Sequence, residues 1–146
     1  MKFLIVSVGK TKTKEIGSLI DEYKKRITKG FKIEEDYFQS HKNKFIDYLN
    51  GKKEGDYIIV CTEFGKEFST EEFKIFIERK LTVVKRLIFF IGDHDGFERF
   101  ININDKRIDL KLSLSRMTFS HEIARLLLVE QLYRVLDMIK GGNYHK

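Results

Sequence analysis

The sequence contains no proline, no tryptophan and a single cysteine among its 146 residues. One cysteine cannot form an internal disulfide, which excludes a disulfide-stabilised scaffold. Cys61 ends the β-like apolar run Tyr57–Cys61, where a free cysteine is usually buried and unreactive. The absence of proline and tryptophan removes two loop and stacking signals but indicates no particular function.

Long hydrophobic runs are also missing. The longest are Phe3–Val8, Leu87–Ile91 and Leu126–Val129, whereas a membrane span needs roughly 18 to 20 apolar residues. No signal-peptide pattern follows Met1, so we expect a cytoplasmic protein. The chain has no repeats and no Gly/Ser/Pro-rich linker, and its length, with 42% hydrophobic and 34% charged residues, predicts one globular domain over residues 1–146.

Several catalytic motifs are absent. Neither G-x-x-x-x-G-K-[ST] nor G-x-G-x-x-G occurs, which disfavours nucleotide triphosphatases and dinucleotide-dependent oxidoreductases. No G-x-S-x-G elbow occurs, and Cys61 lies within a strand-like run, which disfavours serine and cysteine nucleophiles. Asp93, His94 and Asp95 are possible metal ligands. Because consecutive residues seldom converge on one ion, we predict no metal and keep a metal-dependent hydrolase as an alternative.

Negative charge is in short supply: Asp and Glu number 22 against 28 Lys and Arg, a formal net charge of +6. This balance favours a polyanionic partner such as a nucleic acid, although a lysine-rich composition without functional meaning would look the same. A non-catalytic RNA-binding or ribosome-associating module is therefore one alternative function.

Apolar residues recur with strand and helix periods in alternation. Strands are predicted at Lys2–Val8, Phe31–Phe38, Asp56–Thr62, Arg86–Ile91 and Asp109–Leu114. Helices are predicted at about Lys12–Ile27, Asn43–Leu49, Ser69–Lys80 (which opens on the capping box Ser69-Thr70-Glu71-Glu72) and Ser120–Ile139. The alternation predicts an α/β fold whose parallel sheet is covered on both faces. Ligands bind such sheets beyond the carboxyl ends of the strands, so we expect the site in the loops after Thr62, Ile91 and Leu114.

The last predicted helix is apolar on almost every side, which requires burial on two sides. One side meets the sheet. The other is expected to meet a second copy of the chain, with Leu128 a candidate for the interface, because two-fold homodimers are the commonest closed assemblies. The alternative is a helix sandwiched within one subunit.

The last third of the chain carries the most specific motif. It reads Leu112-Ser113-Leu114-Ser115-Arg116-Met117-Thr118-Phe119-Ser120-His121, followed by Arg125, Glu130-Gln131-Leu132-Tyr133-Arg134 and Asn143-Tyr144-His145-Lys146. This string closely resembles the RlmH family of SPOUT-class methyltransferases. The resemblance extends to Met1–Lys10, with its Val-Gly-Lys turn, and to Gly65-Lys66, so it covers essentially the whole chain.

The resemblance implies a three-layer, parallel-sheet SPOUT fold with a C-terminal trefoil knot. It also implies methyl transfer from S-adenosylmethionine to N3 of a pseudouridine in 23S ribosomal RNA. The implied partners are a second copy of the chain and the large subunit or assembled ribosome, with no membrane and no DNA. The family's cofactor positions fall on Cys61, Gly92, Leu114, Ser115, Arg116, Met117, Thr118 and Phe119. Bent backbone and apolar walls of this kind suit an adenine ring and a sulfonium.

The turn after Gly92 departs from the family pattern. The family usually has a second glycine and a neutral residue where this chain has Asp93-His94-Asp95, which brings a carboxylate close to the cofactor path. We expect Asp93 to turn to solvent, as charge in a glycine turn commonly does. The alternative is that its carboxylate favours the positive charge of the sulfonium.

Methylation at N3 requires groups that hold the base and help to remove its proton. The candidates are His121, Arg125, Arg134, Tyr144 and His145. The histidines titrate near neutrality and are candidate proton acceptors, and the arginines are candidates for binding phosphate or the uracil oxygens. Tyr144 is a candidate to stack on a flipped base, with Lys146 on a phosphate. The alternatives are an ordinary Glu130–Arg134 pair, a helix-capping role for His121 and a frayed terminus.

Overall fold

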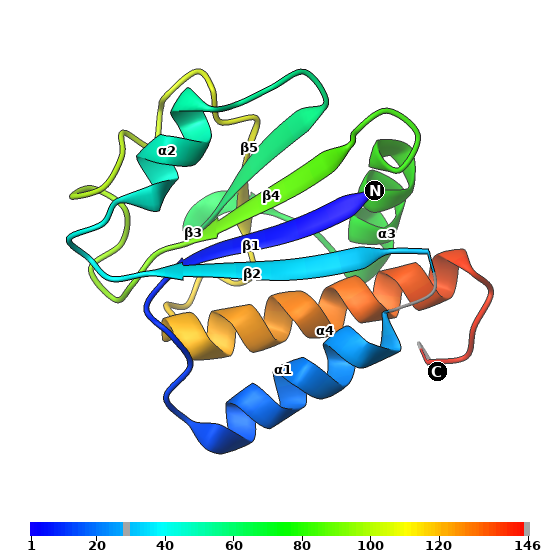
Figure 1. Ribbon diagram of the computed structural model, residues 1–146. Coiled ribbons are helices and arrows are strands. Elements are labelled where there is room, and N and C mark those ends of the chain that lie inside the picture. The colour runs from blue at the N-terminus through cyan, green and yellow to red at the C-terminus, as the bar shows by residue number, and fades with distance from the viewer. Residues whose placement is uncertain (28–29, 145–146) are drawn as a thin grey trace.

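The computed structural model describes residues 1–27 and 30–144. Its centre is a five-stranded parallel sheet in the order β2-β1-β4-β3-β5 (Figure 1). The strands are β1 (Lys2–Val8), β2 (Lys32–Phe38), β3 (Asp56–Glu67), β4 (Arg86–Ile91) and β5 (Leu110–Ser113). The helices are α1 (Lys14–Arg26), α2 (Lys44–Asn50), α3 (Thr70–Lys80) and α4 (His121–Ile139). The predicted α/β fold with a parallel sheet is confirmed.

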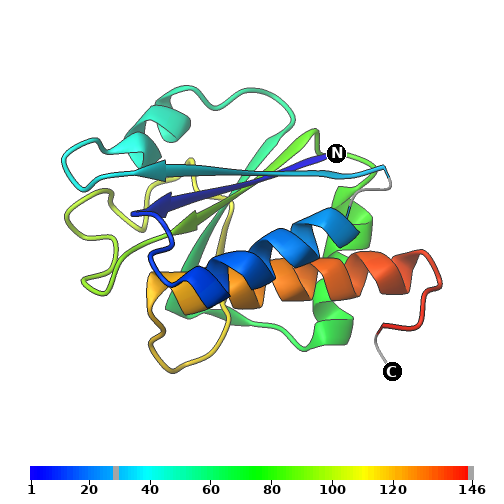
Figure 2. The same ribbon diagram turned by 60° about the horizontal axis from the view of Figure 1, so that its bottom comes forward.

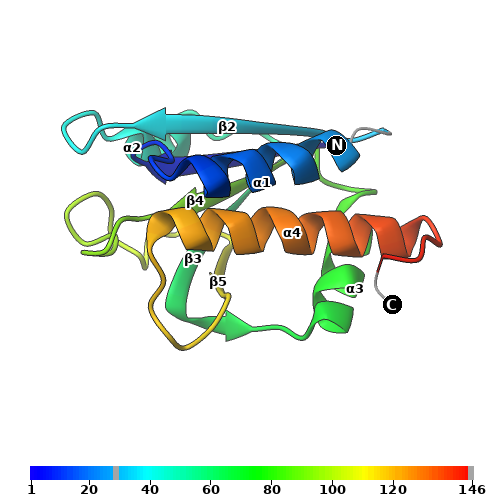
Figure 3. The same cartoon turned by 90° about the horizontal axis from the view of Figure 1, so that it is seen from below.

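Two apolar cores cover the two faces of the sheet. On one face α1, α3 and α4 pack against alternate strand residues such as Ile5 and Phe89, and on the other face α2 packs with the segment that follows β4 (Figures 1 and 3). The inner strands β1 and β4 are apolar on both faces, as strands covered on both sides must be. β2 is polar and lies at the edge, as its sequence predicts.

β3 is longer than predicted because it continues past the edge of the sheet beside β5. Its pairing with β5 shifts register, so that Cys61 and Lys66 both face Leu112. Gly65 allows the crossing, since a Cβ there would lie 2.6 Å from the carbonyl carbon of Lys111. The polar sequence after Thr62 has no strand periodicity, so only this backbone contact with β5 makes it extended.

α4 is sandwiched between α1 and α3 on one face of the sheet (Figure 3). Leu128, Leu132 and Val135 are fully buried by contacts within the chain. The expectation that Leu128 lies in an interface with a second copy is therefore wrong, and the sandwiched alternative explains most of the apolar content of this helix. A narrower outward stripe remains, which includes Ile123, at 37% exposure, and the partly exposed Leu127 and Met138.

None of the helices in the described part of the chain is both long enough and apolar enough to cross a membrane. The trefoil knot implied by the resemblance stays a prediction.

The first turn of α4 holds the loop that joins β1 to α1. Thr13, the N-cap of α1, makes no side-chain capping hydrogen bond. Instead a carboxylate oxygen of Glu122 accepts hydrogen bonds from the backbone N–H groups of Lys12, at 2.8 Å, and Thr13, at 2.9 Å. These hydrogen bonds lower the pKa of the Glu122 carboxyl group. α4 thus caps α1 and fixes the loop at the carboxyl end of β1.

We expect Glu122→Ala to lower the free energy of unfolding by about 0.5–2 kcal/mol, the usual cost of losing a helix cap. Urea denaturation followed by circular dichroism measures this. Glu122→Gln, which keeps one acceptor oxygen, should lose less, and Glu54→Ala, at an exposed turn before β3, is the matched control. Equal stability of Glu122→Ala and wild type would show that the contact contributes nothing.

Candidate functional site

A cavity of about 580 Å³ lies beyond the carboxyl ends of β4 and β5, beside the part of β3 where its register shifts. Its walls are formed by residues 61–64, 91–98, 101–104, 114–115, 117–119 and 124. The loops after Thr62, Ile91 and Leu114 therefore meet in one place, as expected for a parallel α/β sheet.

Most of the residues that the resemblance assigns to a cofactor line this cavity. They are Cys61, Gly92, Leu114, Ser115, Met117, Thr118 and Phe119. Arg116 does not line it: its side chain is 85% exposed and its Nε lies 3.6 Å from a carboxylate oxygen of Glu67. The position of Arg116 in the motif thus puts its side chain outside the cavity while its neighbours face inward.

The turn after β4 brings bare backbone to the cavity. A Cβ on Gly92 would lie 3.1 Å from the carbonyl oxygen of Gly96 and 3.4 Å from the ring of Phe97. Gly96 has φ +79°, a conformation that favours glycine, and its N–H donates to the Asp93 carbonyl oxygen at 2.9 Å. The turn is closed tightly enough that a side chain at Gly92 would displace it.

Asp93 does not turn to solvent, so that expectation is wrong. Its side chain is only 12% exposed and forms an ion pair with Arg99. One carboxylate oxygen also accepts the N–H of Asp95 at 3.0 Å. No pattern in the sequence indicates that Arg99, six residues later in a polar segment, folds back as a counter-charge.

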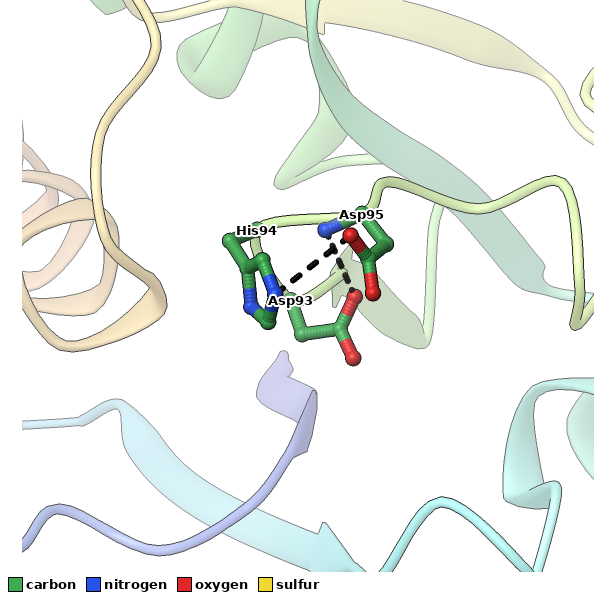
Figure 4. A group of neighbouring side chains, drawn as sticks. All are labelled: Asp93, His94 and Asp95. Carbon is green, nitrogen blue, oxygen red and sulfur yellow. Dashed lines mark hydrogen bonds and ion pairs between the residues drawn. The ribbon is translucent and has the colours of Figure 1, made fainter.

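The three polar side chains of this turn do converge, contrary to the expectation for consecutive residues. Their possible ligand atoms lie within 4.8 Å of one another (Figure 4). His94 is 82% exposed, however, and its Nε2 already lies 3.3 Å from an Asp95 carboxylate oxygen. Asp93 is paired with Arg99, so the side chains of Asp93, His94 and Asp95 form a turn at the rim of the cavity that is held by ion pairs and hydrogen bonds.

Cys61 forms part of the cavity wall. Burial raises the pKa of its thiol to about 12, so at neutral pH the sulfur is protonated. The raised pKa agrees with the interpretation of Cys61 as an unreactive thiol, whereas the residue is partly exposed and not buried as predicted.

His121 begins α4 directly below Gly9, where a Cβ on Gly9 would lie 3.6 Å from the imidazole Cε1. Burial, and then the nearby charge of Arg125, lower the pKa of His121. Its Nδ1 is buried and has no hydrogen-bond partner among the described residues. The capping interpretation is wrong, because the Ser120 hydroxyl caps the helix by accepting the N–H of Ile123.

Arg125 lies in the interior, with its side chain 1% exposed. It pairs with Glu35 at 3.4 Å, donates to the Tyr37 hydroxyl at 3.2 Å and also donates to the Thr11 hydroxyl. The prediction that it contacts an RNA phosphate is wrong for this reason. Its place on an apolar helix gave no indication that the edge strand would supply a buried carboxylate.

Arg134 and Tyr144 lie near the other end of α4. Arg134 pairs with Glu130 at 2.7 Å, which confirms the ordinary ion-pair alternative. The Tyr144 ring packs 4.5 Å from that of Tyr133, and its hydroxyl lies 3.0 Å from the Tyr23 hydroxyl. The tail therefore folds back onto its own subunit as far as Tyr144, while His145 and Lys146 lie outside the described residues.

The tail and the cavity are separated by most of the length of α4. The helix has 19 residues, and at about 1.5 Å per residue it is roughly 28 Å long. Figure 2 shows the described segment that follows α4 at one end of the helix, whereas the loop that leads into α4 lies at the other end. Neither Arg134 nor Tyr144 lines the cavity, so one chain does not bring the predicted substrate-binding residues to the predicted cofactor loops.

Sequence reasoning missed part of the cavity wall, namely residues 97–98, 101–104 and 124. It did place the site after Thr62, but it predicted a loop there, whereas residues 62–64 belong to β3. Residues 101–104 lie in an irregular polar segment that has no periodicity, and no sequence signal places them.

Comparisons with known proteins identify the family of the chain. The family described as a predicted SPOUT methyltransferase matches residues 1–145. The ribosomal RNA large subunit methyltransferase H of Caldicellulosiruptor bescii is 37% identical over 97% of this chain and 98% of its own length. The protein of the same name from Christiangramia forsetii is also 37% identical, over 99% of each chain.

The similarity in fold extends to solved structures. One of them is the SpoU methyltransferase AviRb from Streptomyces viridochromogenes, in complex with the cofactor AdoMet. The match has a TM-score of 0.50 and 12% sequence identity, and covers 96% of this chain but 58% of that chain. At this identity the likeness concerns the fold alone.

We expect His121 to titrate below the ordinary histidine pKa of about 6.5, because burial disfavours its charged form. Two-dimensional NMR of the imidazole resonances against pH measures this. The histidine then binds a proton more readily in the unfolded chain than in the folded one. Its contribution to the free energy of unfolding is therefore present at pH values above the ordinary pKa and is lost as the pH falls through the folded-state pKa. His121→Asn should flatten the dependence in that window. A pKa above the ordinary value would contradict the burial argument.

Proposed function

The chain belongs to the SPOUT methyltransferase family, and from this we propose that it transfers a methyl group from S-adenosylmethionine to large-subunit ribosomal RNA. The observation that carries the proposal is the single cavity in which the three loops assigned to the cofactor meet. As the finer form of the proposal, the acceptor is N3 of a pseudouridine in 23S RNA, in the large subunit or assembled ribosome, in the cytoplasm.

The residues around the cavity fit such a cofactor. The Gly92 turn offers backbone groups at close range, and Leu114, Met117 and Phe119 offer apolar surface for an adenine ring. The bound cofactor would supply an electrophilic methyl group on a positively charged sulfonium. Since Arg99 neutralises Asp93, that carboxylate adds little net negative charge, which favours the backbone role of this turn.

Proton removal from N3 needs a neutral base near the cavity. His121 qualifies on two observations: its pKa is lowered, and it lies three residues before Ala124, which lines the cavity. His145 stays the second candidate. We assign the arginine roles differently, with Arg125 fixing the fold and Arg134 belonging to the substrate-binding group with Tyr144.

A second copy of the chain would unite the two halves of the site. Because Tyr144 and Arg134 lie near the opposite end of α4 from the cavity, an antiparallel pairing of two copies can bring each tail to the partner's cavity. The outward stripe of α4, with Ile123, Leu127 and Met138, supplies apolar surface for such a pairing. We therefore propose a homodimer with two composite sites.

Gly92→Val should abolish binding of S-adenosylmethionine, because its side chain would push against the Gly96 carbonyl group. Isothermal titration calorimetry measures the affinity, and circular dichroism checks the fold. Gly92→Ala should give a smaller loss. Gly17→Ala is the matched control, since its Cβ would meet Thr11 at an ordinary 3.7 Å. If Gly92→Val binds S-adenosylmethionine with wild-type affinity, the cofactor binds elsewhere. If the wild-type protein binds RNA but does not bind S-adenosylmethionine, the non-catalytic alternative is favoured.

Subunit complementation tests the composite site. We mix Gly92→Val with a chain that lacks residues 144–146, each of which we expect to be inactive alone, and measure methylation of large ribosomal subunits. With equal amounts of the two chains, about half of the dimers should be mixed. If each site uses one cavity and the partner's tail, a mixed dimer has one intact site out of two, so about a quarter of wild-type activity should return. If mixed dimers form but no activity returns, the whole site lies in one subunit. If the truncated chain is fully active by itself, the tail has no role in methylation.

A further inference from the structure

The rim of the cavity carries the one exposed phenylalanine or tyrosine ring of the described chain. All phenylalanine and tyrosine residues fall within the described ranges, and each is buried or partly buried except Phe64, which is 87% exposed. Phe64 is also part of the cavity wall. A ring kept in solvent at the mouth of a binding cavity has its face available for a ligand.

Phe64 is held on paired backbone. Its N–H donates to the Thr62 hydroxyl at 3.4 Å, and the residues after it pair with β5 through Lys66 and Leu112. Gly65 lies directly against the backbone of Lys111 and Leu112. The ring is therefore presented by a fixed strand, so that a partner need not meet the cost of ordering a loop.

A second exposed apolar side chain lies on the facing loop. Met117, 73% exposed, follows β5 and lines the same cavity. Cationic groups accompany both residues. Lys66 is exposed two positions beyond Phe64, with its Nζ 5.0 Å from the centre of the Phe68 ring. Arg116, which precedes Met117, is 85% exposed and forms an exposed ion pair with Glu67 at 3.6 Å, which an RNA phosphate would have to replace. An aromatic face flanked by cations matches a nucleotide, with a planar base and an anionic phosphate.

We propose that Phe64 is a stacking platform for an unpaired RNA base at the mouth of the cavity, with Lys66 and Arg116 contacting the adjoining phosphates. The inference rests on the proposed function and adds a surface that holds the RNA at the mouth of the cavity. Single-stranded recognition depends on such stacking, because every base has an aromatic face. Tyr144 does not compete for this role within one chain, since its ring is packed against Tyr133.

The test compares Phe64→Ala and Phe64→Trp with Val83→Ala. Val83 is equally apolar and 71% exposed, but it lies before the amino end of β4. For each we measure the KM for large ribosomal subunits, the affinity for S-adenosylmethionine and the molecular mass by light scattering. We expect Phe64→Ala to raise the KM about five-fold or more, the smaller end of a base-stacking contact, while Phe64→Trp and Val83→Ala stay near wild type.

Other outcomes overturn the inference. A parallel loss of S-adenosylmethionine affinity would make Phe64 a cofactor contact, a change in mass would make it a subunit contact, and an unchanged KM would leave the ring without a substrate role. Fluorescence anisotropy with a short single-stranded oligoribonucleotide gives a readout that needs no methylation. If the wild-type protein does not methylate ribosomal RNA, the proposed function is wrong. The stacking platform is then still tested by the oligonucleotide: weaker binding by Phe64→Ala supports it, and equal binding refutes it.

Discussion

Every strand of the sheet runs in the same direction, and this constraint decides where the chemistry can lie. Parallel pairing places the carboxyl ends of all five strands at one edge. Residues 61–64 of β3 and the loops after β4 and β5 therefore meet although they are far apart in the sequence, and their meeting point is the cavity. The loop after β1 ends at the same edge, beside His121. The crossover helices that parallel pairing requires also bury both faces, so the edge is the place left for a ligand.

α4 connects the cavity to the opposite end of the molecule. Its first turn is tied to the β1–α1 loop through Glu122 and to the edge strand through the buried Arg125–Glu35 pair. Removing one member of a buried ion pair leaves the other charge without compensation, which commonly costs about 3–5 kcal/mol. Lys24 also pairs with Glu35, so the cost here should lie at the lower end. These contacts fix the near end of α4 at the cavity, and the length of the helix then sets how far away its other end, with Arg134, must be.

Periodicity was sufficient for the elements, because strands such as β1 and β4 are buried on both faces and Ser69 and Glu72 form their capping box locally. The cavity walls followed from the resemblance together with the rule for parallel sheets. What could not be predicted depends on contacts between distant residues. The Asp93–Arg99 pair, the burial of Arg125 against Glu35 and the extension of β3 along β5 each need the folded chain. The composition of α4 was ambiguous for the same reason, since a helix between two others and a helix at an interface show the same apolar excess.

The position of Tyr144 bears on how two copies would associate. Its backbone N–H donates to an Asp137 carboxylate oxygen at 2.9 Å, its ring packs on Tyr133, and Arg134 lies 4.7 Å from its ring centre. Burial, and then the hydrogen bond to the Tyr23 hydroxyl and the negative charge of Glu130, raise the pKa of Tyr144, so its own hydroxyl remains a neutral donor. The chain up to Tyr144 is thus ordered by contacts within one subunit. In the proposed dimer it would arrive at the partner's cavity already in place, so association would not bear the entropy cost of ordering this segment.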